Sequence, residues 1–80
     1  MLDIDQRIKS VLSAVFGIDE KEIDEDSAND NIEAWDSLNH MTMVVALEEE
    51  FELEFDEDDI EKFLNFRLIR IIVKEKLDYK

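Results

Sequence analysis

A chain of 80 residues with no cysteine and a single histidine cannot form disulfide bridges, thiolate metal centres or multi-histidine zinc sites. Its 9 basic and 23 acidic side chains give a net charge of −14, which disfavours nucleic acid and anionic membranes and favours encounter with a basic protein surface. Because 45% of the residues are hydrophobic, the chain is too apolar for a disordered acidic tail. With no leader and no apolar run of bilayer length, we expect one domain over residues 1–80, a soluble cytoplasmic monomer that inserts in no membrane.

The spacing of apolar residues predicts an all-α fold, a small four-helix bundle of three long helices and one short helix with a long first loop. Apolar side chains recur every three or four positions over residues 3–16, and Gly17 follows in the position of a helix C-cap. Residues 18–36 then form an acidic connection with room for a helical turn at 20–23. A loop of this length in a small domain is often functional.

The second helix, over residues 37–52, is the most apolar one, and a face this broad predicts a central helix or an apolar patch on its outer surface. Asp56 is expected to cap a short helix that runs through Lys62, and Asn65 to cap a last helix over residues 66–77. In that last helix, Arg70 or Lys74 could pair with acids on the first two helices. The expected apolar face of the second helix is Leu38, Met41, Val44, Val45, Leu47 and Phe51, and that of the last helix is Phe66, Ile69, Ile72, Val73 and Leu77.

Ser37 stands where the acidic loop meets the second helix, and its position allows two interpretations. Its hydroxyl could be an N-cap that accepts a backbone N–H bond. It could instead be a hydroxyl held at a helix N-terminus, where free N–H groups and the helix dipole would stabilise an attached phosphate. An Asp-Ser-Leu tripeptide by itself favours the N-cap.

The wider pattern resembles the acyl carrier proteins. Asp36-Ser37-Leu38 opens an apolar helix that closes with Ala46-Leu47-Glu48-Glu49-Glu50-Phe51, and the order of elements is similar across essentially the whole chain. The resemblance implies that Ser37 is the attachment site of 4′-phosphopantetheine from coenzyme A, whose terminal thiol carries an acyl group as a thioester. It also accounts for the absence of cysteine, since the reactive sulfur would belong to the cofactor.

The resemblance extends to the neighbours of Ser37. Asp36 and Leu38 complete the motif, and Asp36 would contact the phosphopantetheinyl transferase. The surface presented to acyl-transferring or condensing enzymes with basic surfaces would include Asn39, Met41, Val45, Glu48 and Glu49. Met41 and Val45 also fit an ordinary core, and the carboxylates at the helix end also fit a solvated face.

Three residues depart from the pattern of fatty-acid carriers. Asn39 and Thr42 stand where many of those carriers have acids, so the surface near Ser37 is less acidic. Trp35 is similar to the residue found in stand-alone carriers of specialised acyl or aminoacyl pathways, and it could also simply anchor the end of the loop.

The resemblance also implies an acyl-chain cavity lined by Leu47, Phe55, Phe63 and Ile69. Because Phe55 and Phe63 are bulky, we expect this cavity to be small or differently shaped, which favours short or exposed acyl groups.

The sequence therefore predicts a carrier, not an enzyme, serving fatty-acid, polyketide or related specialised acyl metabolism. Other functions stay open as alternatives: a peptidyl or D-alanyl type of aminoacyl carrier, and an unmodified acidic adaptor that binds a basic protein. A Ser37–His40 nucleophile and base pair would lack an orienting group and a glycine-rich oxyanion loop. A calcium loop over residues 24–35 would lack the central glycine and the closing glutamate of an EF-hand.

Overall fold

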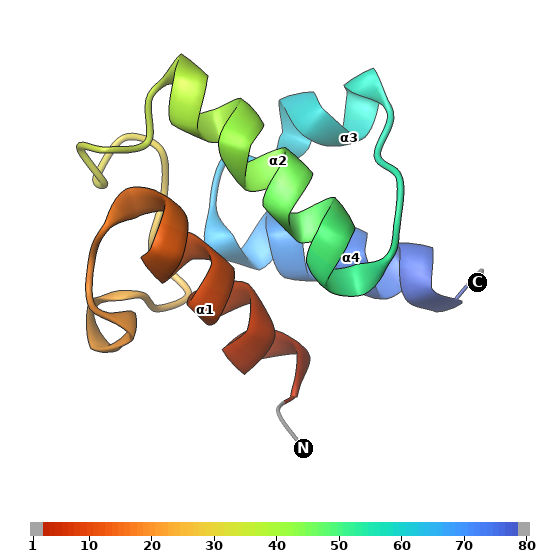
Figure 1. Ribbon diagram of the computed structural model, residues 1–80, viewed down its shortest axis with the longest axis horizontal. Helices are drawn as coiled ribbons and strands as arrows, with labels where there is room; N and C mark the ends of the chain where they lie inside the picture. The colour runs from red at the N-terminus through yellow and green to blue at the C-terminus, as the bar shows by residue number, and fades with distance from the viewer. Residues whose placement is uncertain (1–2, 79–80) are drawn as a thin grey trace.

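The computed structural model describes residues 3–78 and contains four α-helices, three of them long. Helix α1 spans Ile4–Phe16, α2 Ser37–Phe51, α3 Glu57–Lys62 and α4 Phe66–Asp78, and the short 3-10 helix η1 spans Glu20–Glu22. Figure 1 shows α2 crossing the molecule in front of α4, with α1 beside it and α3 above. Helix α1 packs against α2 and α4, and α3 packs against α4. The predicted all-α bundle with a long first loop is confirmed.

Local capping chemistry sets the helix boundaries. Gly17 adopts the left-handed conformation, with φ of 68°, and its N–H bonds the carbonyl of Ser13. Asp56 accepts the N–H of Asp59 while the Asp59 carboxylate accepts the N–H of Asp56, which forms a capping box at α3. The Asn65 side chain accepts the Leu68 N–H at the start of α4. The predicted caps of these three helices are therefore confirmed.

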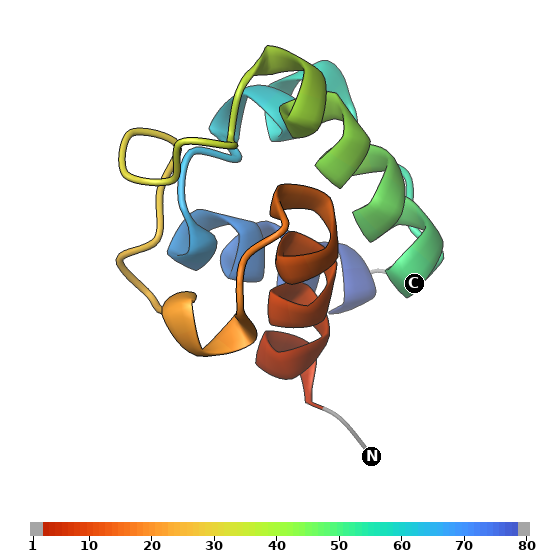
Figure 2. The ribbon, with the colours of Figure 1, turned by 60° about the vertical axis from the view of Figure 1, so that its left-hand side comes forward.

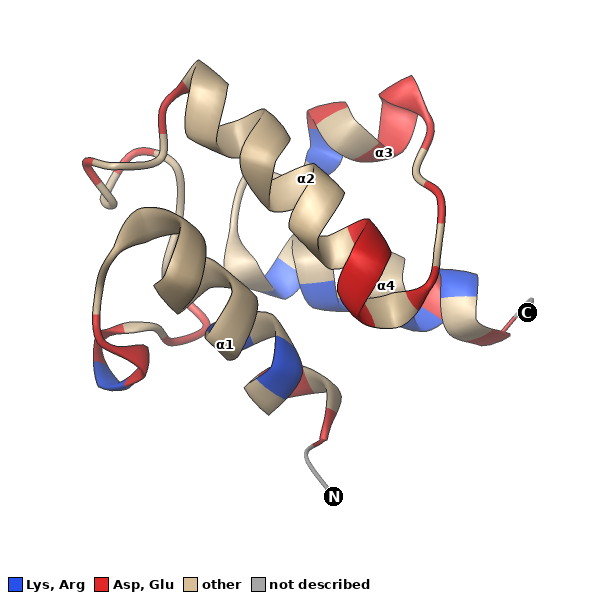
Figure 3. Cartoon of the chain, in the orientation of Figure 1, with Lys and Arg blue, Asp and Glu red and all other residues tan. Residues whose placement is uncertain are grey.

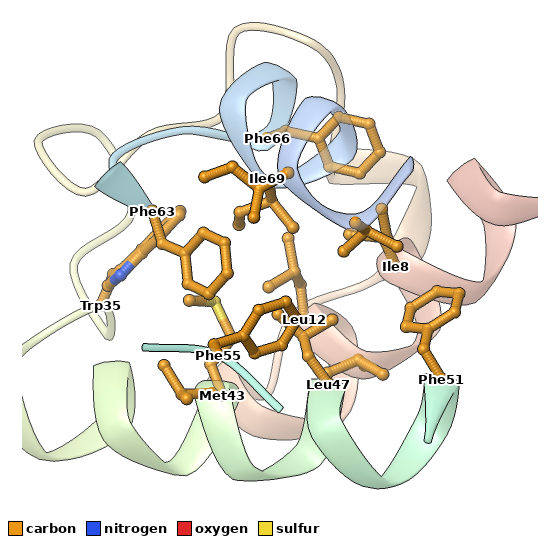
Figure 4. Close-up of a cluster of buried hydrophobic side chains, with 14 of the residues drawn as sticks. Ile8, Leu12, Trp35, Met43, Leu47, Phe51, Phe55, Phe63, Phe66 and Ile69 are labelled. Carbon is orange, nitrogen blue, oxygen red and sulfur yellow. The ribbon is translucent and has the colours of Figure 1, made fainter. Parts of the chain in front are cut away.

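The core of the bundle is a row of apolar side chains from α1, α2, α4 and the first loop, together with Phe55 and Phe63 on either side of α3. Figure 4 shows Trp35 at one end of this row and Phe51 at the other. Helix α2 buries Met43, Val44, Leu47 and Phe51. Of the expected apolar residues of α2, Leu38, Met41 and Val45 are 77%, 47% and 50% exposed, so they form the alternative apolar patch on the outer surface, and Met43, which the expected face does not include, is buried.

The first loop is fastened to the start of α4 and to α1, although it has little regular structure of its own. Figure 2 shows the loop along the left side of the molecule, with η1 packed beside α1 and the later part of the loop farther from it. The Asn29 N–H bonds the Leu64 carbonyl at 3.0 Å, and the Phe66 N–H bonds the Ser27 carbonyl at 2.8 Å. These two bonds flank an antiparallel β-bridge between Ala28 and Asn65, which is the only isolated β-bridge within residues 3–78. The middle of the first loop, at residues 27–29, is thus fixed to the start of α4.

Arg70 ties three parts of the chain together. Its guanidinium bonds Asp5 of α1 at 2.8 Å and Glu25 of the first loop at 2.7 Å. The Arg70 hydrogen bond and charge lower the pKa of Glu25, and the same bond with that of Asp5 raises the pKa of Arg70. The predicted pairing of Arg70 with an acid of the first helix is confirmed.

Asp59 provides a test of how charge stabilises this fold, because its carboxylate pairs with Lys76 of α4 at 2.9 Å as well as capping α3. Burial raises the pKa of Asp59, but the hydrogen bonds from Lys76 and from the Asp56 backbone lower this pKa by more than burial raises it. The pKa of Asp59 therefore lies below its ordinary value of 3.8. We expect Asp59→Asn to lower the free energy of unfolding by about 1 kcal/mol at pH 7. This contribution is complete above pH 3.8 and is lost as the pH falls through the lower pKa of the folded state.

Urea unfolding of both proteins from pH 7 to pH 2.5 measures this difference. Asp58→Asn is the matched control, because Asp58 is an exposed neighbour without a partner in the described chain. A difference between wild type and Asp59→Asn that persisted unchanged at the lowest pH would contradict the assignment to the charged Asp59.

Candidate functional site

The start of α2 is built by Asp36, not by Ser37. The Asp36 carboxylate accepts the Asn39 N–H at 2.8 Å, and the Asp36 carbonyl accepts the His40 N–H at 2.8 Å. The Ala34 carbonyl accepts two bonds, from the Asp36 N–H at 3.0 Å and from the Asn39 side-chain amide at 2.8 Å. Ser37 is the first residue of the helix, so the interpretation of Ser37 as the N-cap is wrong.

Because Asp36 supplies the cap, the Ser37 hydroxyl is free. Ser37 is exposed and its hydroxyl makes no hydrogen bond within residues 3–78, whereas Ser13 donates to the Ile18 carbonyl and Ser27 is buried and bonded to Asp24. The backbone N–H groups of Ser37 and Leu38 also lack an acceptor in this part of the chain. An exposed hydroxyl beside two free N–H groups and the positive end of a helix dipole fits a covalently attached phosphate.

Trp35 and His40 hold this turn against the core. Trp35 is 5% exposed and stacks on Phe16 of α1 with ring centroids 5.1 Å apart. Its indole N–H donates to Nδ1 of His40 at 2.9 Å, and Nε2 of His40 lies 2.9 Å from the Ile60 carbonyl of α3. Since Nδ1 accepts the indole N–H, Nε2 carries the ring proton and donates a hydrogen bond to the Ile60 carbonyl. The aromatic anchor predicted at the loop end is therefore present.

The same contacts decide against the Ser37–His40 pair of the enzyme alternative. Both ring nitrogens of His40 are engaged, one by Trp35 and one by Ile60. A general base needs a free nitrogen within hydrogen-bond reach of the hydroxyl it activates. His40 is a structural link here and not a base for Ser37.

The exposed side of α2 carries an apolar surface next to Ser37. A shallow hollow of about 450 Å³ is lined by Leu38, Met41, Thr42, Val45, Ala46 and Glu49. Figure 3 shows that the first part of α2 has no charged residue and that acids gather at its C-terminal end. Met41 and Val45, two of the residues expected to face partner enzymes, are thus on the surface and not in the core.

The glutamates at the end of α2 differ in what they contact. Glu48 accepts the Phe55 N–H at 2.9 Å, and Glu50 pairs with Arg7 at 2.8 Å. Glu52 ends the helix in the left-handed conformation, with φ of 55°. Glu49 is exposed, borders the apolar hollow, and its carboxylate has no partner in the described chain. Of the five expected partner-facing residues, Asn39 and Glu48 are therefore engaged within the fold, whereas Met41, Val45 and Glu49 lie free at the surface.

The structure brings the four residues of the expected acyl cavity together in the core. Leu47, Phe63 and Ile69 are fully buried and Phe55 is nearly so. The Phe55 and Phe63 rings meet edge to face with centroids 4.9 Å apart, and they lie in the middle of the cluster in Figure 4. The bulk expected of these two side chains thus fills space between α2 and the α3–α4 junction.

Neither a metal site nor a membrane-spanning helix is found among residues 3–78. No three His, Asp or Glu side chains converge there in a way that could hold a metal ion. No helix in this part of the chain is long and apolar enough to cross a membrane.

Comparison with known proteins decides the family. A family model described as a phosphopantetheine attachment site matches residues 6–69. The chain belongs to this family. The holo acyl carrier protein of Geobacter metallireducens, solved by NMR, is 26% identical to this carrier, with a TM-score of 0.85 over 98% of this chain and 90% of that one. The resemblance to acyl carrier proteins is confirmed, and 4′-phosphopantetheine is the prosthetic group that such a carrier bears.

Two features of the carrier's site were not apparent from its sequence. The bond between Trp35 and His40 joins two residues that no sequence pattern pairs. Asn39 is the second, because its amide donates to the Ala34 carbonyl, and the acid found there in many fatty-acid carriers could not donate. The departure at Asn39 therefore has a local structural reason.

Proposed function

We propose that this carrier holds acyl groups as thioesters on a 4′-phosphopantetheine arm attached to Ser37, in fatty-acid, polyketide or related specialised acyl metabolism. The observation that carries the proposal is the free, exposed Ser37 hydroxyl at the N-terminus of α2, within the region that matches the attachment-site family. When bound, the arm supplies the thiol that the chain itself lacks.

Attachment requires that Ser37 react with coenzyme A on a phosphopantetheinyl transferase. The Ser37 Oγ attacks the phosphorus that bears the pantetheine, forming an O–P bond and breaking the phosphoanhydride bond. Adenosine 3′,5′-bisphosphate leaves, and the hydroxyl proton passes to a base of the transferase. The free N–H groups of Ser37 and Leu38 would bond the phosphate oxygens once the diester is formed.

The acids and the apolar surface of α2 support acyl-transferring or condensing enzymes with basic surfaces as partners. The net charge of −14 favours such partners at a distance, and Met41, Val45 and Glu49 offer apolar and charged contacts close to Ser37. Trp35 is similar to the residue found in stand-alone carriers of specialised acyl or aminoacyl pathways, so an aminoacyl carrier is a second candidate. The two candidates share Ser37 and differ only in the cargo.

Incubation with coenzyme A and a broad-specificity phosphopantetheinyl transferase, followed by intact mass spectrometry, tests the proposal. We expect the wild-type chain to gain one phosphopantetheine and Ser37→Ala to gain none. Ser10→Ala is the matched control, because Ser10 is an exposed serine in the middle of α1 and its loss should leave loading unchanged. A wild-type chain that gains no mass would instead favour the unmodified acidic adaptor.

A further inference from the structure

A second hollow, which shares only Met41 with the apolar surface of α2, opens beside Ser37. It has a volume of about 360 Å³ and is lined by Asn29, Trp35, Asp36, Ser37, His40 and Met41. This volume lies at the lower end of the range for small-molecule sites, about 300 to 1,000 Å³. None of the four core residues assigned to an acyl cavity lines it.

The wall formed by Trp35 and His40 offers no free polar atom. The indole N–H and Nδ1 of His40 satisfy each other at 2.9 Å, and Nε2 is taken by the Ile60 carbonyl. What these rings present to the hollow is therefore apolar, and the half-exposed Met41 side chain adds to this.

Besides the Ser37 hydroxyl and the Asp36 carboxylate, Asn29 supplies a free polar group to the lining of the hollow. Its backbone is fixed by the N–H bond to the Leu64 carbonyl, but its side-chain amide has no hydrogen-bond partner within residues 3–78. An amide can donate and accept at the same time. The Asp36 carboxylate, already engaged by the Asn39 N–H, also lines the hollow and makes it unfavourable for an anion.

We propose that this hollow seats the pantetheine part of the arm attached to Ser37. Pantetheine is a neutral chain with two methyl groups on one carbon, a hydroxyl and two amides, which matches an apolar wall facing a single free carboxamide. The Asn29 amide bonds an amide or the hydroxyl of the arm, and the two methyl groups lie against Trp35 and Met41. Because Ser37 is part of the lining, the arm is tethered at the site, so individually weak contacts are enough to hold it.

This inference rests on the proposed function, so its test begins with the loaded chain verified by intact mass. In NMR spectra of the labelled holo protein, we expect NOEs from the two arm methyl groups to Trp35 and Met41. The indole N–H signal of Trp35, the only tryptophan, should also shift between the apo and holo forms. In Asn29→Ala we expect these NOEs and the indole shift to be lost, while loading still occurs.

Asp30→Ala is the matched control, because Asp30 is an exposed neighbour in the same loop that does not line the hollow. It should keep the NOEs. A fully loaded protein with no such NOEs, or with arm contacts to α3 alone, would contradict binding of the arm in this hollow but not its attachment at Ser37. A chain that gains no mass would overturn both.

Discussion

Replacing Trp35 with alanine should lower the free energy of unfolding by about 3 to 5 kcal/mol, the cost of removing a large aromatic side chain from a well-packed core. Trp35 is 5% exposed, stacks on Phe16 and also binds His40. Domains of this size have little stability to spare, so Trp35→Ala should be substantially unfolded in dilute buffer. Urea unfolding followed by circular dichroism at low temperature measures the change.

Trp35→Phe separates the stacking from the hydrogen bond. A phenyl ring keeps contact with Phe16 but leaves Nδ1 of His40 without its donor, so we expect a smaller loss of about 1 to 2 kcal/mol. Leu38→Ala is the control, because Leu38 is 77% exposed and its truncation should change stability by less than about 0.5 kcal/mol. If Trp35→Ala were no more harmful than Leu38→Ala, Trp35 would not be the anchor of the loop.

The features that can be predicted from the sequence are those that neighbouring residues decide. Gly17, Asp56 and Asn65 mark helix ends because each satisfies backbone groups within four positions of itself, and such chemistry can be read directly from the chain. Ser37 was harder, since both Asp36 and Ser37 are good capping residues and stand side by side. Only the Asp36–Asn39 bond shows that the aspartate caps and the serine is left free.

The buried face of α2 cannot be predicted from the sequence, because the apolar residues of this helix are too dense to show a period. From Met41 to Leu47 only Thr42 is polar, so several faces of α2 would fit the core equally well. Packing against α1 decides that Met43 is buried and that Met41 and Val45 are exposed. Because the exposed pair lies next to Ser37, this choice also creates the apolar surface that we assign to partner enzymes.

Apart from the pair of Arg70 and Asp5, contacts between residues far apart in the chain could not be predicted. If all the glutamates at the end of α2 were free, they would form one acidic surface opposing the helix dipole. In the structure, the guanidinium of Arg7, which is 43 positions away, donates to the Glu50 carboxylate. It also donates to the backbone carbonyl of Glu50 at that helix end. The Phe55 N–H donates to the Glu48 carboxylate. These partners leave Glu49 as the carboxylate beside the apolar hollow, which sharpens the expectation for partner binding.

Glu49→Lys should therefore slow loading by the transferase about tenfold at low salt, because a charge at the contact surface changes the rate of electrostatically steered association. The salt dependence of loading should become flatter, while the free energy of unfolding changes by less than about 0.5 kcal/mol. Rates of phosphopantetheine incorporation at several salt concentrations, measured by mass spectrometry, give both quantities.

Glu54→Lys is the matched control for Glu49→Lys, since Glu54 is exposed, has no partner in the described chain and lies outside the α2 hollow. Both variants change the net charge equally, so a slower reaction of Glu49→Lys alone would place the effect at the contact surface. Glu48→Lys should behave differently, because it removes the acceptor of the Phe55 N–H and should lower stability by about 1 to 2 kcal/mol. If Glu49→Lys and Glu54→Lys loaded at the same rate, the acids would act only through the total charge of the carrier, and recognition would have to rest on the apolar side chains beside Ser37.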